Sequence, residues 1–266
     1  MPEYGIAAWC LDPAGADRDA LAAAARHGLA ALHLAVDTAE GVARLTRPEW
    51  QDAITRCCQE TGVRISCLAL NIVERMPICG MHADEESQRR FQDIVLVALE
   101  FAAKAAVPLI YVPSFGLAEI TSDDGLYETA ALLSRAAESA QPFGIEVASE
   151  NSLGPADTAR FVDLVGQGNF RILFDIYNPL RWGHSPMEII AVGFDAFATQ
   201  IHVKDGWLPR YGNAPLGAGD GNVAEIVREL MQRGFDGTFV LENDYGEEHG
   251  LDVRCDLETL RMICDS

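Results

Sequence analysis

Residues 145–151 read Ile-Glu-Val-Ala-Ser-Glu-Asn, a short apolar run that ends in a carboxylate and an amide. The segment that follows, Ala156–Val165, has the apolar spacing of an amphipathic helix. This unit, a predicted strand and then a predicted helix, recurs along the whole chain. Alternation of this kind is typical of a parallel sheet covered by helices.

Eight such units are predicted. We expect strands at Gly5–Trp9, Ala30–Ala35, Arg64–Leu70, Leu109–Pro113, Ile145–Glu150, Arg171–Asp175, Thr199–Lys204 and Gly237–Glu242. We expect helices at Asp17–His27, Pro48–Thr61, Glu85–Ala105, Gly125–Ala140, Ala156–Val165, Pro186–Val192, Val223–Arg233 and Cys255–Cys264. Eight β–α units in 266 residues predict an α/β protein with the (β/α)8 TIM-barrel fold, as one domain over residues 1–266. A doubly wound open sheet is the alternative, but the first strand-to-helix turn, residues 9–13, lacks its glycine-rich fingerprint.

The composition is that of an acidic chain with a large apolar fraction. The formal net charge is −20, and 49% of the residues are hydrophobic. An acidic surface repels the phosphates of nucleic acids and anionic membranes, so we expect neither as a partner. No apolar run is long enough to cross a bilayer and no basic stretch precedes the first strand, so we expect no secretory signal and a cytoplasmic location. Seven scattered cysteines without a Cys-x-x-Cys pair favour reduced thiols.

Polar side chains end four consecutive predicted strands, the fifth to the eighth. They are Glu150, Asp175, His202 and Glu242. Because barrel strands carry their functional groups at the carboxyl ends, these four side chains are expected to converge at one mouth. Three carboxylates would repel one another there, and a divalent cation removes the repulsion. The sequence therefore predicts one metal site made by these four residues.

Three oxygen ligands and one nitrogen suit a hard or borderline cation. We expect Mn²⁺, with Mg²⁺, Co²⁺ and Zn²⁺ as alternatives, although Zn²⁺ prefers more nitrogen or sulfur. Each residue alone also has a structural explanation, since Asp175 can begin a turn and His202 can be a core histidine. Four such residues in phase on consecutive strands favour the metal site.

Several segments resemble the xylose-isomerase-like superfamily of TIM-barrel sugar isomerases and epimerases. They are Ala102–Pro113, Val147–Asn151, Phe174–Asn178, Ile201–Asp205, Leu216–Gly221 and Val240–Asn243. That group includes ketose 3-epimerases, inosose isomerases and dehydratases, hydroxypyruvate isomerase and endonuclease IV. The resemblance implies a metal-dependent isomerase or epimerase of a small sugar or keto-polyol, with a small carbohydrate as its partner and a homodimer or homotetramer as its assembly. A catalytically silent sugar-binding barrel is the alternative outside enzymes, and a full set of metal ligands argues against it.

In epimerases of this group, two metal-bound glutamates flank the substrate. One removes a proton next to the carbonyl, and the other returns it on the opposite face; by position they are Glu150 and Glu242. A metal would stabilise the cis-enediolate that forms. Many relatives carry histidine three residues after the strand-six aspartate, where this chain has Asn178. That departure keeps a second reaction open, a dehydratase (lyase) of a keto-inositol or keto-sugar on the same metal site.

Lys204, one of only two lysines in the chain, is predicted to be a third catalytic residue. Strand alternation places it on the same side as His202, where it would hydrogen-bond a substrate oxygen or protonate a leaving hydroxyl. The structural alternative is a lysine that neutralises surplus carboxylates. The residues predicted to bind substrate are Trp9, Asn71, Asn178, Arg181 and Arg210. Because the predicted mouth loops are poor in basic residues, the sequence favours an unphosphorylated substrate.

Overall fold

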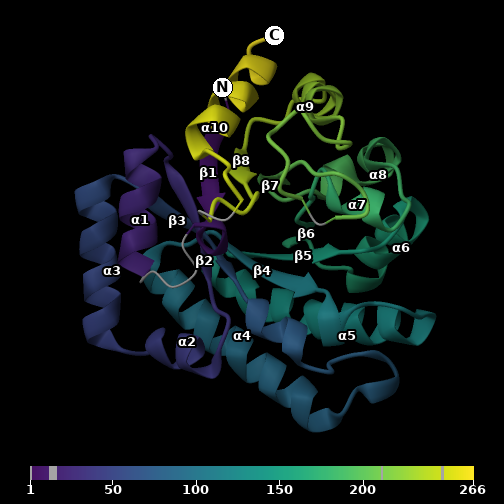
Figure 1. Cartoon of the computed structure of the whole chain (residues 1–266). Helices are drawn as coiled ribbons and strands as arrows, with labels where there is room; N and C mark the ends of the chain where they lie inside the picture. The colour runs from purple at the N-terminus through teal and green to yellow at the C-terminus, as the bar shows by residue number, and fades with distance from the viewer. Residues whose placement is uncertain (1, 12–16, 211, 247–248) are drawn as a thin grey trace. The chain divides into compact units, whose positions relative to one another are not determined.

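The computed structural model describes residues 2–11, 17–210, 212–246 and 249–266. Its parallel strands are hydrogen-bonded in the order β6-β5-β4-β3-β2-β1-β8-β7, and helices alternate with them along the chain (Figure 1). Each neighbour in this order is also a neighbour in sequence, apart from the pairing of β1 with β8. A doubly wound sheet would instead reverse its strand order near the middle. The predicted (β/α)8 TIM-barrel fold is therefore confirmed.

All eight predicted strands and all eight predicted helices have counterparts. The strands are β1 (Glu3–Ala7), β2 (Ala31–Ala35), β3 (Arg64–Ala69), β4 (Leu109–Ser114), β5 (Glu146–Asn151), β6 (Phe170–Ile172), β7 (Gln200–Val203) and β8 (Thr238–Leu241). The helices are α1 (Asp17–Arg26), α2 (Ala39–Arg44), α3 (Pro48–Thr61), α4 (Glu85–Ala105), α5 (Asp123–Ala140), α6 (Pro155–Val165), α7 (Asn178–Arg181), α8 (Pro186–Gly193), α9 (Val223–Gln232) and α10 (Val253–Cys264). The additional short helices α2 and α7 were not predicted, because six and four residues are too few for a helical pattern to show.

The first and sixth strands end earlier than predicted. Trp9 belongs to a 3₁₀ helix, Ala8–Cys10, that follows β1, and Asp175 lies three residues beyond the end of β6. Side-chain caps fix helix starts where the sequence offers them: Ser122 accepts a hydrogen bond from the backbone N–H of Gly125 at the start of α5, and Asp84 accepts one from Ser87 at the start of α4. Such caps satisfy backbone N–H groups that have no partner inside the helix.

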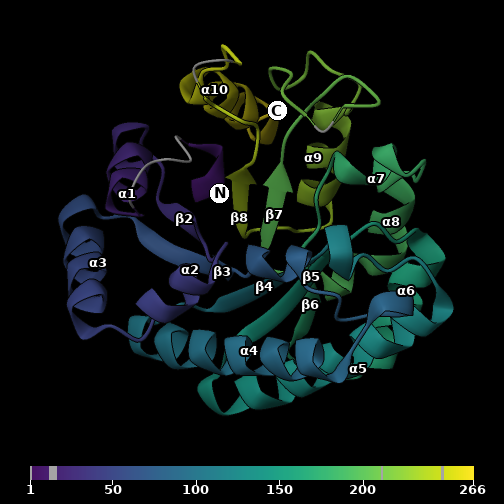
Figure 2. The same ribbon diagram turned by 60° about the horizontal axis from the view of Figure 1, so that its bottom comes forward.

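Contacts along the chain define two compact units. The first comprises Met1–His33, Cys57–Ile65 and Phe174–Ser266, and the second comprises Leu34–Arg56 and Ser66–Leu173. In the second unit, β4 and β5 pair along their whole length, and α4 and α5 run side by side (Figure 2). No described helix in either unit is long and apolar enough to cross a membrane.

In the first unit, β8 lies between β1 and β7. Val240 pairs with Gly5 on one side and with His202 on the other. The segment after β6 lies on the other side of β7, since the backbone N–H of His202 donates to Phe174 and that of Ile176 donates to His202. These pairings bring the carboxyl ends of β7 and β8 and the segment at Asp175 to the same place, from which a long loop leads to α9 (Figure 2).

Candidate metal centre

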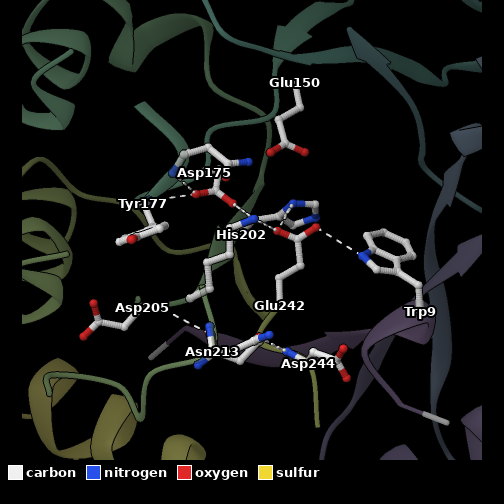
Figure 3. Close-up of polar contacts among 12 residues, drawn as sticks. Trp9, Glu150, Asp175, Tyr177, His202, Asp205, Asn213, Glu242 and Asp244 are labelled. Carbon is white, nitrogen blue, oxygen red and sulfur yellow. Dashed lines mark hydrogen bonds and ion pairs between the residues drawn. The ribbon is translucent and has the colours of Figure 1, made fainter. Parts of the chain in front are cut away.

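Three of the predicted ligands, Asp175, His202 and Glu242, lie together in the first unit (Figure 3). Asp175 forms a parallel bridge with His202, and the backbone N–H of Glu242 donates to the carbonyl of Val203 at 2.9 Å. The His202 Nδ1 atom lies 3.3 Å from Glu242 Oε2. Backbone pairing thus brings together an imidazole nitrogen from β7 and two carboxylates that follow β6 and β8.

The two carboxylate oxygens of Asp175 have different partners. Oδ1 accepts the backbone N–H groups of Tyr177 at 2.7 Å and Asn178 at 2.6 Å, at the start of α7. Oδ2 lies 2.9 Å from the Nζ atom of Lys204. Asp175 therefore does begin a turn, as its structural explanation requires, while its second oxygen is directed to the cluster.

Lys204 joins two of the candidate ligands. Its Nζ atom lies 2.9 Å from Asp175 Oδ2 and 2.7 Å from Glu242 Oε2, and the side chain is buried. The inward orientation predicted from strand alternation is thus what the structure shows. In this arrangement the ammonium group offsets the repulsion between the carboxylates of Asp175 and Glu242, and it is also close enough to reach a ligand bound to them.

Glu242 is held at both of its oxygens. Trp9 Nε1 donates to Oε1 at 3.2 Å (Figure 3). Lys204 Nζ lies 2.7 Å from Oε2, and His202 Nδ1 lies 3.3 Å from it. Burial alone would raise the pKa of Glu242, but the charges of His202 and Lys204 outweigh it and hold that pKa well below its ordinary value. A carboxylate kept ionised in this way can ligate a cation or accept a proton at neutral pH.

Behind His202 lies a second histidine that the sequence did not single out. His202 Nε2 is 3.1 Å from His33 Nδ1, and His33 Nε2 is 2.6 Å from Gln200 Oε1. Burial, followed by the neighbouring His202, lowers the pKa of His33 to about 3. His33, like His202, lies between apolar residues of a predicted strand. It was not predicted as a site residue because it lies in the middle of β2 and not at its end.

Glu150, the fourth predicted ligand, belongs to the second unit. It is buried near the end of β5, and the Tyr111 hydroxyl on β4 donates to its Oε2 at 2.9 Å. In the first unit, Asp175, His202 and Glu242 each offer one ligand atom to a group of described residues that could hold a metal ion, and these three atoms lie within 4.8 Å of one another. Two carboxylate oxygens and one imidazole nitrogen form a donor set that fits a divalent cation.

The remaining predicted substrate residues have varied surroundings. Asn71 begins a 3₁₀ helix and donates to Asp37 Oδ1 at 3.1 Å, within the second unit. In the first unit, the Arg181 guanidinium stacks over the ring of Trp182, and Arg210 is exposed on the loop after β7. The backbone carbonyl of Arg210, and not its side chain, accepts a hydrogen bond from the Tyr177 hydroxyl.

The glycine-rich turn Leu216–Gly221 is folded around the carboxylate of Asp205. Asp205 Oδ2 accepts the backbone N–H groups of Gly217 and Gly219, and Oδ1 accepts those of Gly206 and Gly221, at 2.8 to 3.0 Å. A Cβ on Gly219 would lie 2.3 Å from the carbonyl oxygen of Gly206, so only glycine fits there. Because these N–H groups bind a side chain of the protein itself, they are not the phosphate cradle that a glycine-rich turn suggests.

Replacement of Asp205 by alanine is expected to destabilise the protein by at least about 3 kcal/mol, because buried N–H groups lose a charged acceptor. Chemical denaturation would measure the change in unfolding free energy. The matched control is Asp236→Ala, at an exposed position before β8, for which we expect a change within about 0.5 kcal/mol. Equal stabilities of the two variants would contradict the anchoring role of Asp205.

Comparison with known proteins identifies one matching family and several similar proteins. The family model described as "Xylose isomerase-like TIM barrel" matches residues 21–261. The 2-epi-5-epi-valiolone 7-phosphate 2-epimerase of an Actinoplanes species is 34% identical over 261 residues, which cover 97% of this chain and 93% of that protein. The L-ribulose-5-phosphate 3-epimerase UlaE of Shigella flexneri is 24% identical, over 82% of this chain and 81% of that protein. The crystal structure of the IolI protein with a bound zinc atom superposes with a TM-score of 0.78 at 13% identity, over 98% of this chain and 96% of that one.

Both curated relatives are epimerases of sugar-like phosphates, which confirms the predicted class of enzyme.

Proposed function

Because this chain belongs to the xylose isomerase-like TIM-barrel family, we propose that it is a divalent-metal-dependent epimerase, built as one domain over residues 1–266, that inverts a carbon next to a ketone. The observation that carries the proposal is the joining of Asp175, His202 and Glu242 with Lys204 in one buried cluster. One lysine balances only part of the charge of the candidate carboxylate ligands, and a cluster of titratable groups of this kind is typical of a functional site.

The four side chains Glu150, Asp175, His202 and Glu242 would hold the cation, for which we propose Mn²⁺. A cation bound there would supply positive charge to stabilise a cis-enediolate derived from the substrate. Asp175 and His202 serve only as ligands in this proposal. The zinc in the structurally similar IolI protein supports a divalent ion and leaves Zn²⁺ as the alternative.

Glu150 and Glu242 move the proton in the proposed reaction. One removes it from the carbon next to the ketone, and the other returns it on the opposite face. The structure supports this assignment, since each carboxylate has one oxygen oriented by a neutral donor: Tyr111 for Glu150 and Trp9 for Glu242. A fixed donor on one oxygen limits the rotation of each carboxylate, which a group that transfers a proton to or from one defined carbon requires.

For the substrate we propose a phosphorylated keto-cyclitol or ketose, because the 34% identical relative acts on a valiolone phosphate. This replaces the preference for an unphosphorylated substrate that the scarcity of basic residues suggested. In the proposed site, Lys204 donates to a substrate oxygen, while Trp9, Asn71, Asn178, Arg181 and Arg210 line the pocket.

If the phosphate is bound, the phosphorylated keto-cyclitol should have a kcat/KM at least about 100-fold above that of its dephosphorylated form, because remote binding energy lowers the barrier at the reacting carbon. NMR in D₂O would follow both deuterium uptake next to the ketone and the appearance of the epimer. L-Ribulose 5-phosphate and L-ribulose form the matched pair for a ketose. Equal kcat/KM values within both pairs would contradict a phosphorylated substrate.

A dehydratase acting on the same proton is the second candidate. Lys204 favours it, because an ammonium group 2.7 Å from Glu242 and 2.9 Å from Asp175 could protonate a departing hydroxyl. A product lighter by one water would support the lyase, whereas a product of unchanged mass with exchanged hydrogen would support the epimerase.

We further propose that the protein works in the cytoplasm as a homodimer or homotetramer, without nucleic-acid or membrane partners.

A further inference from the structure

We propose that Tyr177 is a positioning residue for substrate binding, because its hydroxyl fixes the tip of a hairpin, Trp207–Arg210, beside the candidate metal centre. The inference rests on the proposed function for the identity of the ligand, a phosphorylated keto-cyclitol or ketose. The anchoring of the hairpin follows from contacts within the first unit alone. Tyr177 does not touch the reacting atoms in this proposal, and it acts through the hairpin tip, which binds the part of the substrate away from the ketone.

The hairpin belongs to the loop that leads from β7 to α9. Gly206 and Asn213 form an antiparallel bridge, so the chain reverses direction between them. The tip is a turn, in which the backbone N–H of Arg210 donates to the carbonyl of Trp207 at 2.9 Å. Trp207 and Leu208 are 43% and 45% exposed. One turn thus presents an indole and a guanidinium to solvent, a pair that suits the carbon face and the phosphate of a sugar-like phosphate.

Tyr177 is fully buried and is enclosed by this loop. Its hydroxyl donates to the backbone carbonyl of Arg210 at 3.0 Å. A Cβ on Gly206 would lie 2.7 Å from the Tyr177 hydroxyl oxygen, and a Cβ on Gly221 would lie 3.0 Å from the tyrosine ring. One side chain therefore contacts the loop where the hairpin begins, at the hairpin tip and in the glycine-rich turn that follows.

Two contacts join the hairpin to the candidate metal centre. The backbone N–H of Tyr177 donates to Asp175 Oδ1 at 2.7 Å, so the residue that supports the tip is itself fixed by a candidate ligand (Figure 3). Near the end of the hairpin, a Cβ on Gly212 would lie 3.5 Å from Cδ of Lys204. The Nζ atom of that lysine lies 2.9 Å from Asp175 and 2.7 Å from Glu242. A substrate bound at the cluster therefore lies next to the hairpin.

The base of the hairpin is anchored without the Tyr177 hydroxyl. Asn243 Oδ1 accepts the backbone N–H of Asn213 at 3.1 Å. At the tip, the backbone N–H of Leu208 donates to Asp220 at 2.9 Å, but this hydrogen bond is exposed, so water competes for both partners. Loss of the tyrosine hydroxyl should therefore loosen the tip and leave the base of the hairpin in place.

The first test follows the tip without any substrate. Trypsin cleaves after arginine, and cleavage inside a folded protein requires the segment to open. In Tyr177→Phe, cleavage after Arg210 should be at least about fivefold faster than in wild type, because one hydrogen bond that holds the tip closed is lost. Tyr245→Phe is the matched control, since it removes a hydroxyl hydrogen bond of 2.9 Å to Asp256 in the same unit. Equal cleavage rates in the two variants would overturn the anchoring role of Tyr177.

The second test measures KM and kcat with excess Mn²⁺ for the phosphorylated keto-cyclitol and for L-ribulose 5-phosphate. Tyr177→Phe should raise KM at least about fivefold and leave kcat within about twofold, since the tip binds the substrate away from the reacting carbon. Affinity for Mn²⁺ should stay within about twofold, because the backbone N–H that donates to Asp175 is retained. Tyr245→Phe should change neither KM nor kcat. An unchanged KM in Tyr177→Phe would overturn the role in substrate binding.

A tip variant separates action through the hairpin from a direct effect of Tyr177. Trp207→Ala combined with Arg210→Ala removes both exposed side chains and keeps the backbone carbonyl at position 210. This tip variant should raise KM at least about tenfold, and an unchanged KM would overturn the proposal even if Tyr177→Phe failed to fold. Adding Tyr177→Phe to the tip variant should change KM by less than about twofold, because the two changes act on the same contact. A further fivefold increase would also overturn the proposal.

Failure of the proposed function gives a different result. Wild-type protein that exchanges no proton in either phosphorylated compound would contradict the proposed epimerase. The cleavage rates after Arg210 would still decide whether Tyr177 holds the hairpin tip, because they need neither metal nor substrate.

Discussion

Glu242→Gln should lower the rate of epimerisation, and of proton exchange next to the ketone, by at least about 10³-fold. An amide cannot accept the substrate proton. It also satisfies only part of the existing network, because Trp9 and Lys204 both donate to this carboxylate. Deuterium uptake from D₂O, measured with Mn²⁺ in excess, would report the proton transfer separately from any change in metal affinity.

The matched control for this variant is Glu258→Gln, on an exposed position of α10. It removes the same charge far from the cluster and should leave the exchange rate within about twofold of wild type. Circular dichroism of both variants checks that the fold is retained. An exchange rate for Glu242→Gln equal to that of the control would refute the role of Glu242 as a base.

Asp175→Asn should weaken Mn²⁺ binding by at least about 100-fold while leaving the start of α7 intact. The reason is that the two carboxylate oxygens of Asp175 have different partners. Asparagine keeps the Oδ1 acceptor for the N–H groups of Tyr177 and Asn178, but it replaces Oδ2 by an amide that cannot ligate a cation. Calorimetric titration with Mn²⁺ would measure the affinity, and thermal unfolding would measure the stability.

Asp252→Asn serves as the control, because Asp252 also accepts a backbone N–H, that of Arg254, at the start of α10. We expect it to bind Mn²⁺ like the wild type.

In the wild type, chelation of the metal should abolish exchange and lower the free energy of unfolding by about 3 kcal/mol relative to protein with Mn²⁺ at 100 times its dissociation constant. Full activity of chelated protein would count against any metal mechanism.

Much of the site could be read from periodicity. A strand alternates its faces every two residues, and a barrel gathers the carboxyl ends of its strands, so a polar residue at a strand end has a predictable position. This is why Asp175, His202, Lys204 and Glu242 were expected close together, and the structure joins them. For Asp175 the sequence left two roles open, a turn-forming residue and a metal ligand, and the structure shows that they are compatible. Its Oδ1 atom accepts the backbone N–H groups at the start of α7, and its Oδ2 atom faces Lys204.

The periodicity of the sequence could not identify residues that contact the candidate ligands from the middle of a strand or from an irregular segment after one. His33 and Gln200 are 167 positions apart and meet only because β2 and β7 contribute to the same interior. Trp9 was predicted as a strand end and pocket wall, but it lies in a 3₁₀ helix, from which its indole reaches Glu242. Tyr111 reads as an ordinary core aromatic of β4 until its hydroxyl is seen on Glu150.

The sequence by itself determined the fold, the four candidate ligands and the inward lysine, because each depends on a local pattern that repeats along the chain. Only the tertiary structure decided what surrounds them. It showed that the glycine-rich turn encloses Asp205, that Glu242 is held ionised by His202 and Lys204, and that His33 and Gln200 support His202. These features depend on the direction of individual hydrogen bonds between distant segments, and no spacing within one segment encodes that direction.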